Sequence, residues 1–155
     1  MTQYHFVSVW KYKAPVEKIW PIITDAEKWP TWWRGVRQVE TLQKGDEDGV
    51  GTLQRFTWRS ILPYNLVFDT QVLRVIKYKE IAGDSKGELA GMGVWDFSQE
   101  GPITQMRYTW DVATTEAWMN FLAPIARPFF MWNHDVIMRW GSEGLAKLLG
   151  TPVIQ

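Results

Sequence analysis

The C-terminal segment from Phe129 to Leu149 limits the possible folds of this chain more than any other stretch, because its pattern predicts one long amphipathic helix. At 100° per residue, Asp135, Arg139, Ser142 and Glu143 fall together on a polar face. The opposite, apolar face consists of Phe130, His134, Ile137, Gly141, Leu145 and Leu148. A helix with this pattern needs an apolar partner surface that covers the second face.

Two residues on the apolar face are unusual for a plain packing surface. His134 places an imidazole among apolar side chains, and Gly141 leaves side-chain volume empty in the middle of the helix. Glycine costs about 1 kcal/mol relative to alanine in a helix interior, so its presence requires a compensating gain. Close packing against another element is one such gain, and room for a ligand in a concave apolar site is the other. The sequence leaves both open.

Composition narrows the class of protein. The 155 residues suit one domain, residues 1–155. Basic and acidic residues both number 17, so charge gives no reason to expect a nucleic acid as partner. The absence of cysteine excludes disulfides and cysteine-ligated metals, and with only two histidines we expect no metal site. We also expect no cofactor, and the absence of a signal-peptide pattern predicts a cytoplasmic location. Eleven tryptophans exceed ordinary core needs and suggest a concave apolar surface.

The rest of the chain predicts one strand, two short helices and about six further strands. Residues 4–12 alternate enough to form the first strand. Helical spacing over 16–23 follows Pro15, and a second short helix is predicted to be capped by Asp25 and to stop before Pro30. The further strands are predicted at 36–43, 51–60, 65–78, 80–83, 88–99 and 105–115.

The short loops between these strands require an antiparallel sheet. In the last hairpin, Trp95 and Phe97 are predicted to share a face with Tyr108, Trp110 and Val112 of the neighbouring strand. This aromatic sheet face and the apolar helix face can both be buried only by packing together. If the large aromatic side chains hold the two layers apart, the layers enclose a cavity.

Several segments of the chain resemble a known family. They are APVEKIW at 14–20, TDAEKWPTWWRGV at 24–36, WRSILPYNLVFDTQV at 58–72, YTWDVATT at 108–115 and RPFFMWNHDVIMRWGSEGLAKLL at 127–149. These segments are similar to the polyketide cyclase/dehydrase-type members of the START/Bet v 1-like (SRPBCC) superfamily, and the resemblance covers almost the whole chain. It implies an α+β helix-grip fold, in which a curved antiparallel sheet of about seven strands wraps around a long C-terminal helix and two short helices follow strand 1.

The same resemblance implies a hydrophobic cavity between the sheet and the helix. Members of the superfamily include lipid and sterol carriers, hormone receptors and aromatic cyclases, so the fold does not select one chemistry. None of the shared segments is a catalytic motif, and each describes packing.

His134 is the main polar candidate in the expected cavity. It is either a buried histidine bonded to a backbone carbonyl or a tyrosine, or a cavity-facing group that orients a ligand carbonyl or moves its protons. Tyr108 and Tyr64 are candidate phenol partners. The large aromatic residues have a plainer alternative as ordinary core. The predicted ligand-binding residues are Trp58, Phe68, Trp95, Phe97, Tyr108, Trp110, Phe130, Asn133, His134, Ile137 and Gly141.

Two functions are compatible with these residues. The preferred one is a binding or carrier domain for a hydrophobic small molecule, either lipid-like or aromatic and polyketide-like. The alternative is a polyketide cyclase or dehydrase in which His134 and Tyr108 assist proton transfer. A third hypothesis concerns the segment 118–132, whose Trp, Phe, Met and Leu residues suit a transient contact with a membrane surface.

Overall fold

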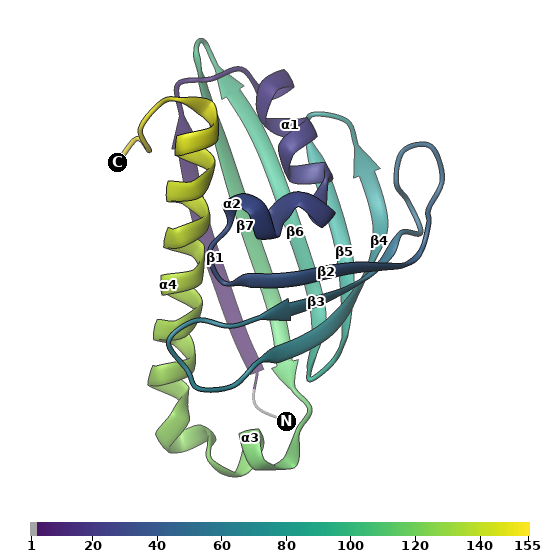
Figure 1. Cartoon of the computed structure of the whole chain (residues 1–155), viewed down its shortest axis with the longest axis vertical. Coiled ribbons are helices and arrows are strands. Elements are labelled where there is room, and N and C mark those ends of the chain that lie inside the picture. Colours follow the sequence, from purple (N-terminus) through teal and green to yellow (C-terminus); the bar gives the residue numbers. More distant parts are fainter. Residues whose placement is uncertain (1–2) are drawn as a thin grey trace.

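Seven antiparallel strands form one sheet in the computed structural model, which describes residues 3–155 (Figure 1). The strands follow the order β1-β7-β6-β5-β4-β3-β2 across the sheet, so the first strand pairs with the last. Every other pair joins strands that are consecutive in the chain. The strands are β1 (Gln3–Tyr12), β2 (Val36–Gln43), β3 (Leu53–Trp58), β4 (Leu66–Ile76), β5 (Glu80–Gly87), β6 (Leu89–Glu100) and β7 (Ile103–Thr114).

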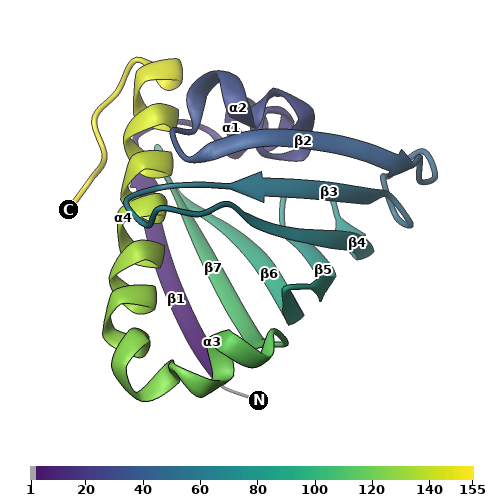
Figure 2. The ribbon, with the colours of Figure 1, turned by 60° about the horizontal axis from the view of Figure 1, so that its bottom comes forward.

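The sheet is strongly curved. Register shifts interrupt the pairing of β2 with β3 at two places and the pairing of β4 with β5 at one. Such irregularities bend a strand and increase its twist. Figure 2 shows the result: β2 and β3 reach across toward the long helix α4 (Ala123–Leu149), while β1, β7 and β6 run along its other side. The inner face of the sheet therefore surrounds one face of the helix.

Two short helices follow β1, with a 3-10 turn between them: α1 (Val16–Thr24), η1 (Ala26–Lys28) and α2 (Trp29–Trp32). The predicted boundary before Pro30 is wrong, since Pro30 lies in the first turn of α2. Proline fits there because the first backbone N–H groups of a helix have no intrahelical partner. Asp25 makes no side-chain capping bond, contrary to the prediction.

The long helix begins earlier than its apolar periodicity indicates. A short helix α3 (Ala117–Phe121) precedes α4, which runs through Pro128 from Ala123. Pro124 occupies the first turn, where its missing N–H costs nothing, and Pro128 removes only one backbone hydrogen bond. The two prolines therefore mark the beginning of this helix and do not separate it from an irregular segment.

The buried face of α4 is rotated relative to the prediction. Leu148 is 51% exposed, whereas Ser142 is buried together with Gly141 and Leu145. The Ser142 hydroxyl donates to the Arg139 carbonyl oxygen at 2.8 Å, so its burial leaves no unpaired group. The observed order of elements and the sheet curved around a C-terminal helix confirm the predicted helix-grip fold.

Candidate functional site

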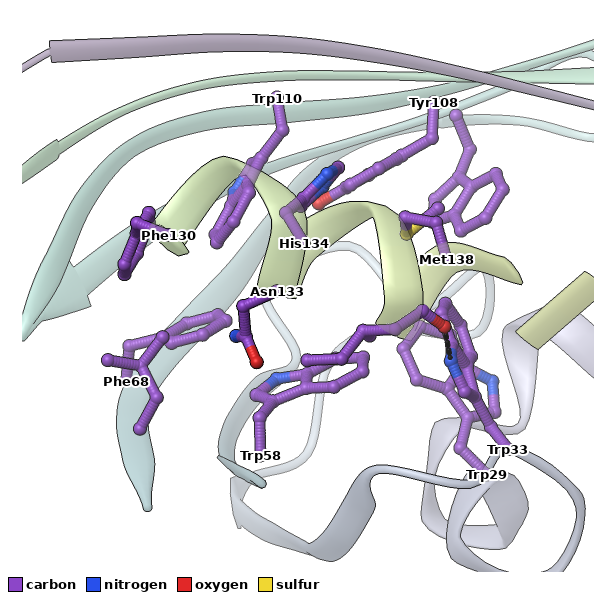
Figure 3. Close-up of a pocket in the computed structure, with 13 residues that line it drawn as sticks. Trp29, Trp33, Trp58, Phe68, Tyr108, Trp110, Phe130, Asn133, His134 and Met138 are labelled. Carbon is purple, nitrogen blue, oxygen red and sulfur yellow. Dashed lines mark hydrogen bonds between the residues drawn. The ribbon is translucent and has the colours of Figure 1, made fainter. Parts of the chain in front are cut away.

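A cavity lies between the sheet and the middle of α4 (Figure 3). We call this cavity the inner chamber. The centre of a water molecule can occupy about 70 Å³ of it. Its walls come from α4, from the inner face of the sheet and from the short helices. The lining residues are Trp29, Trp33, Trp58, Leu66, Phe68, Trp95, Tyr108, Trp110, Phe130, Asn133, His134, Ile137 and Met138.

Nearly all of the predicted ligand-binding residues line this chamber, and the two exceptions are Phe97 and Gly141. The Phe97 ring packs against Trp20 of α1, with 5.1 Å between the ring centroids. A Cβ atom on Gly141 would overlap Trp33 and would lie 2.8 Å from Trp10 Cη2. Gly141 thus allows close packing of tryptophans, the first of the two gains considered above, and does not leave room for a ligand.

Four lining residues were missed by the sequence reasoning: Trp29, Trp33, Leu66 and Met138. Met138 follows His134 by four residues, so helical spacing alone places it on the same face. The sequence pattern placed Trp29 at the end of the second short helix and Trp33 beyond it, and it gave neither residue a packing partner. Figure 3 shows both at the end of the chamber opposite Phe130.

His134 lies at the centre of the chamber wall, and neither of its ring nitrogens has a hydrogen-bond partner among residues 3–155. Its Nδ1 is 3.8 Å from Asp135 Oδ1, which is too long for a hydrogen bond. The imidazole instead stacks on Phe6, with ring centroids 3.9 Å apart. The predicted backbone or tyrosine partner is therefore absent from this part of the chain. Burial lowers the pKa of His134 to about 4, so the ring is neutral at pH 7.

The indole N–H groups of Trp58 and Trp110 in the chamber wall are also buried without a partner among residues 3–155. Other tryptophans of the same wall differ. Trp33 Nε1 donates to the Ile137 carbonyl oxygen at 2.9 Å, and Trp29 Nε1 donates to the Ile23 carbonyl oxygen at 3.1 Å. Buried indole N–H groups normally find a partner. The chamber thus contains structural tryptophans with satisfied donors and two tryptophans with free donors.

Asn133 and Tyr108 add further polar groups to the wall. The Ser60 hydroxyl donates to Asn133 Oδ1, which fixes the side-chain amide from the β3–β4 loop. Tyr108 packs against Trp95, with 4.5 Å between the ring centroids, and burial raises the pKa of its phenol above the usual value. A Cβ atom on Gly93 would lie 2.5 Å from the Tyr108 hydroxyl oxygen, so only glycine leaves space for the phenol. Figure 3 shows the Tyr108 hydroxyl directed toward His134.

A second, outer chamber of about 160 Å³ lies on the other side of the aromatic side chains. It shares Trp29, Trp58, Phe68, Trp95 and Tyr108 with the inner chamber, and it reaches the β2–β3 loop. Its remaining wall is more polar, because it includes the side chains of Thr24, Asp48, Thr52, Gln54, Thr70 and Ser85. The inner and outer chambers are therefore both mostly apolar and share five aromatic residues, and the outer one carries more polar side chains.

Two further observations concern metals and membranes. Among residues 3–155, no group of three or more His, Cys, Asp or Glu side chains is arranged to hold a metal ion. Within the same residues, no helix is both long and apolar enough to cross a bilayer.

Acid should destabilise the protein through His134. The pKa of this imidazole is about 4 in the folded protein and about 6.5 in an unfolded chain. Between these pH values the unfolded state binds more protons, so the free energy of unfolding falls as the pH falls from 6.5 to 4. The full loss amounts to about 3 kcal/mol. Denaturant titrations at several pH values should show this loss in the wild type and in the exposed-site control His5→Gln. The same pH dependence of the free energy of unfolding in the wild type and in His134→Leu would contradict this role of His134.

Comparisons with known proteins agree with this architecture. Residues 12–135 match the model of the family described as polyketide cyclase / dehydrase and lipid transport. A search of curated proteins finds no significant match. Among solved structures, the Zhui aromatase/cyclase from Streptomyces sp. R1128 is 15% identical, with a TM-score of 0.75, 95% of this chain covered and 96% of that chain.

Two more solved structures share the fold. A START superfamily protein from Mycobacterium smegmatis is 18% identical with a TM-score of 0.72, and the match covers 91% of this chain and 93% of that one. A major latex-like protein from Panax ginseng is 10% identical with a TM-score of 0.61, covering 84% of this chain and 97% of that one. At these identities the structures support the fold alone. Since the family model matches most of the chain, the chain belongs to the polyketide cyclase/dehydrase and lipid transport family.

Proposed function

We propose that this protein binds a hydrophobic small molecule that carries oxygen atoms, either an aromatic, polyketide-like compound or a lipid-like one. The observation that supports this proposal is the set of unpartnered nitrogens on Trp58, Trp110 and His134 inside an otherwise apolar chamber. A buried polar group without a partner costs about 1–3 kcal/mol. Carbonyl and hydroxyl oxygens of a ligand would satisfy the two indole donors and a neutral imidazole, while the rings around them bury its apolar surface.

The outer chamber supports an elongated ligand. A molecule that enters between the shared aromatic residues would place one end near His134 and the other near Thr70 and Ser85. The hydroxyl oxygens of these two residues are 3.2 Å apart and both line the outer space. A ligand with polar groups at both ends and rings or methylene groups between them fits this distribution.

A second candidate function is cyclisation or dehydration of a polyketide-like substrate, favoured by the presence of Tyr108 and His134 in the wall of the same chamber. In such a reaction a neutral His134 nitrogen takes a proton from a carbon next to a carbonyl, and the Tyr108 hydroxyl donates a hydrogen bond to the carbonyl oxygen. General bases work best when their pKa lies near the operating pH. A histidine with a pKa of about 4 is a weak base at neutral pH, so we place binding first.

The binding proposal is tested by filling the inner chamber. Leu66 of β4 lines it, whereas Leu73 of the same strand is 49% exposed and lines neither chamber. We expect a hydroxylated anthraquinone to quench the tryptophan fluorescence of the wild type and of Leu73→Trp in a saturable manner. Leu66→Trp should weaken this binding at least about tenfold, because the new indole occupies the space of the ligand. Anthracene, which lacks the oxygens, should bind about tenfold more weakly than the anthraquinone.

Thermal unfolding of both variants shows whether each one folds. Equal affinity of the folded Leu66→Trp and Leu73→Trp variants for the anthraquinone would contradict binding in the inner chamber. Equal affinity of the wild type for anthracene and the anthraquinone would contradict the role of the unpartnered nitrogens.

A further inference from the structure

One end of the molecule exposes an unusual number of large apolar side chains. They belong to α3 and to the first turns of α4, which Figures 1 and 2 show together at the end of the molecule where β1 begins. Such side chains are usually buried. We call this surface the end patch, and its members, with their exposed fractions, are Trp118 (50%), Phe121 (85%), Ile125 (73%), Phe129 (55%) and Trp132 (54%).

The end patch is an organised surface. Ile125, Phe129 and Trp132 follow one another at i, i+4 and i+7, so they share one face of α4. On the inward face of the same turns, Phe130 and His134 are buried and line the inner chamber. The first half of α4 is thus apolar on both faces, and the fold covers only one of them. A helix that is apolar all round normally has a partner on each side.

The charges of the segment identify the class of partner. Between Ala117 and Asn133 the sequence contains no carboxylate and a single cation, Arg127. The Arg127 guanidinium lies over the Tyr4 ring at 4.8 Å and donates to the Gln3 carbonyl oxygen at 3.0 Å. Tryptophan and phenylalanine side chains without acidic neighbours suit the boundary between lipid headgroups and acyl chains.

The area of the patch argues against a second copy of this chain as partner. Its four aromatic side chains expose on the order of 500 Å² in total. A stable protein interface buries about 800 Å² per partner. The patch is comparable in size to the largest apolar patch of a typical monomer, about 300–600 Å², and such patches are often functional.

The end patch also adjoins a small side pocket next to the inner chamber. Trp118 contacts Tyr64 of the β3–β4 loop edge to face, with 5.4 Å between the ring centroids. Tyr64 lines this side pocket together with Leu66, Phe130 and Asn133, and these last three residues also line the inner chamber. A surface that covers the end patch would therefore lie beside this side pocket.

From these observations we propose that the end patch docks on the surface of a lipid bilayer, with the side pocket facing the membrane. Docking is driven by apolar insertion, since Arg127 is the one cation of the segment. A cation near an anionic surface contributes about 1 kcal/mol, so neutral and anionic vesicles should bind the protein within about fivefold of each other. Docking through the end patch does not depend on which ligand the inner chamber binds.

Vesicle flotation tests this docking on the whole chain. The wild type should float with vesicles of phosphatidylcholine and with vesicles of phosphatidylcholine mixed with phosphatidylserine. The double variant Phe121→Asp/Ile125→Asp should lose at least about tenfold in bound fraction, because aspartate opposes insertion. The matched control Leu73→Asp/Ile76→Asp changes two exposed apolar residues of β4 and should float like the wild type. Circular dichroism confirms that each variant is folded.

Three results would overturn docking through the end patch. They are a wild type that floats with neither kind of vesicle, flotation that the Phe121→Asp/Ile125→Asp change leaves intact, and a wild-type dimer in solution that the same change dissociates. Quenching of tryptophan fluorescence by the anthraquinone, measured on the variants without vesicles, reports ligand binding independently of flotation. Loss of flotation with intact quenching supports docking whatever the ligand is.

Discussion

Gly141→Ala is expected to lower the free energy of unfolding by about 2 kcal/mol, in the range typical of overpacked cores. In an open position the same change would stabilise a helix by about 1 kcal/mol. Here the added methyl group would overlap Trp33 and lie 2.7 Å from its Nε1 and 2.8 Å from Trp10 Cη2. Trp33 is almost fully buried and its Nε1 is bonded to the Ile137 carbonyl oxygen, so it cannot move without breaking that bond.

Denaturant titration measures the loss, and Arg139→Ala on the exposed face of α4 is the control, with an expected change below about 0.5 kcal/mol. Trp33→Phe should also destabilise the protein, since it removes a satisfied donor and the atoms that Gly141 accommodates. The double variant should then lose less than the sum of the two single changes, because the smaller ring leaves room for the methyl group. An unchanged or raised stability of Gly141→Ala alone would show that the helix and the tryptophans are not in close contact.

The second large effect is expected at His134, where stability and binding should change in opposite directions. His134→Leu removes a buried imidazole whose two nitrogens have no partner among the described residues, and it keeps most of the volume. We expect the free energy of unfolding at pH 7 to rise by about 1 kcal/mol or more. Affinity for the anthraquinone should fall by about tenfold, because a hydrogen bond to the ligand is lost.

Denaturant titration and tryptophan quenching on the same samples measure the two effects. Trp33→Phe is the matched contrast, since its donor is satisfied within the protein and its loss should reduce stability. If a substrate is converted by this protein, His134→Leu should lower the rate by about 10²–10⁴-fold, the range of general acid–base catalysis. A His134→Leu variant that is less stable than the wild type at pH 7 would mean that the imidazole has a structural partner.

The fold could be predicted because its signals are local. Alternation of apolar residues over β3, β6 and β7 and helical spacing over α4 required a sheet packed on a helix, and the structure confirms this. The resemblance to the family supplied the curvature that periodicity does not describe. Two of the errors arose at prolines. Pro30 and Pro128 both lie inside helices, where position in the first turn or tertiary packing overrides the tendency of proline to end a helix.

The site could be predicted only in part. Most wall residues follow from which face of a strand or helix they occupy, as for Trp110 and His134. The face that a residue occupies does not tell whether its buried donor finds a hydrogen-bond partner. Trp33 and Trp58 are the same residue type in the same wall, yet one donor has the Ile137 carbonyl oxygen as partner and the other has none. That difference depends on where α4 crosses the sheet, which no local pattern specifies.

Ligand binding in the inner chamber is tested most directly by native mass spectrometry of the purified protein incubated with the hydroxylated anthraquinone. We expect one ligand per chain on the wild type, release of that ligand on denaturation, and little or no adduct on the folded Leu66→Trp variant. A wild type that remains at the mass of the bare chain would contradict this binding, and so would equal adducts on the wild type and on Leu66→Trp.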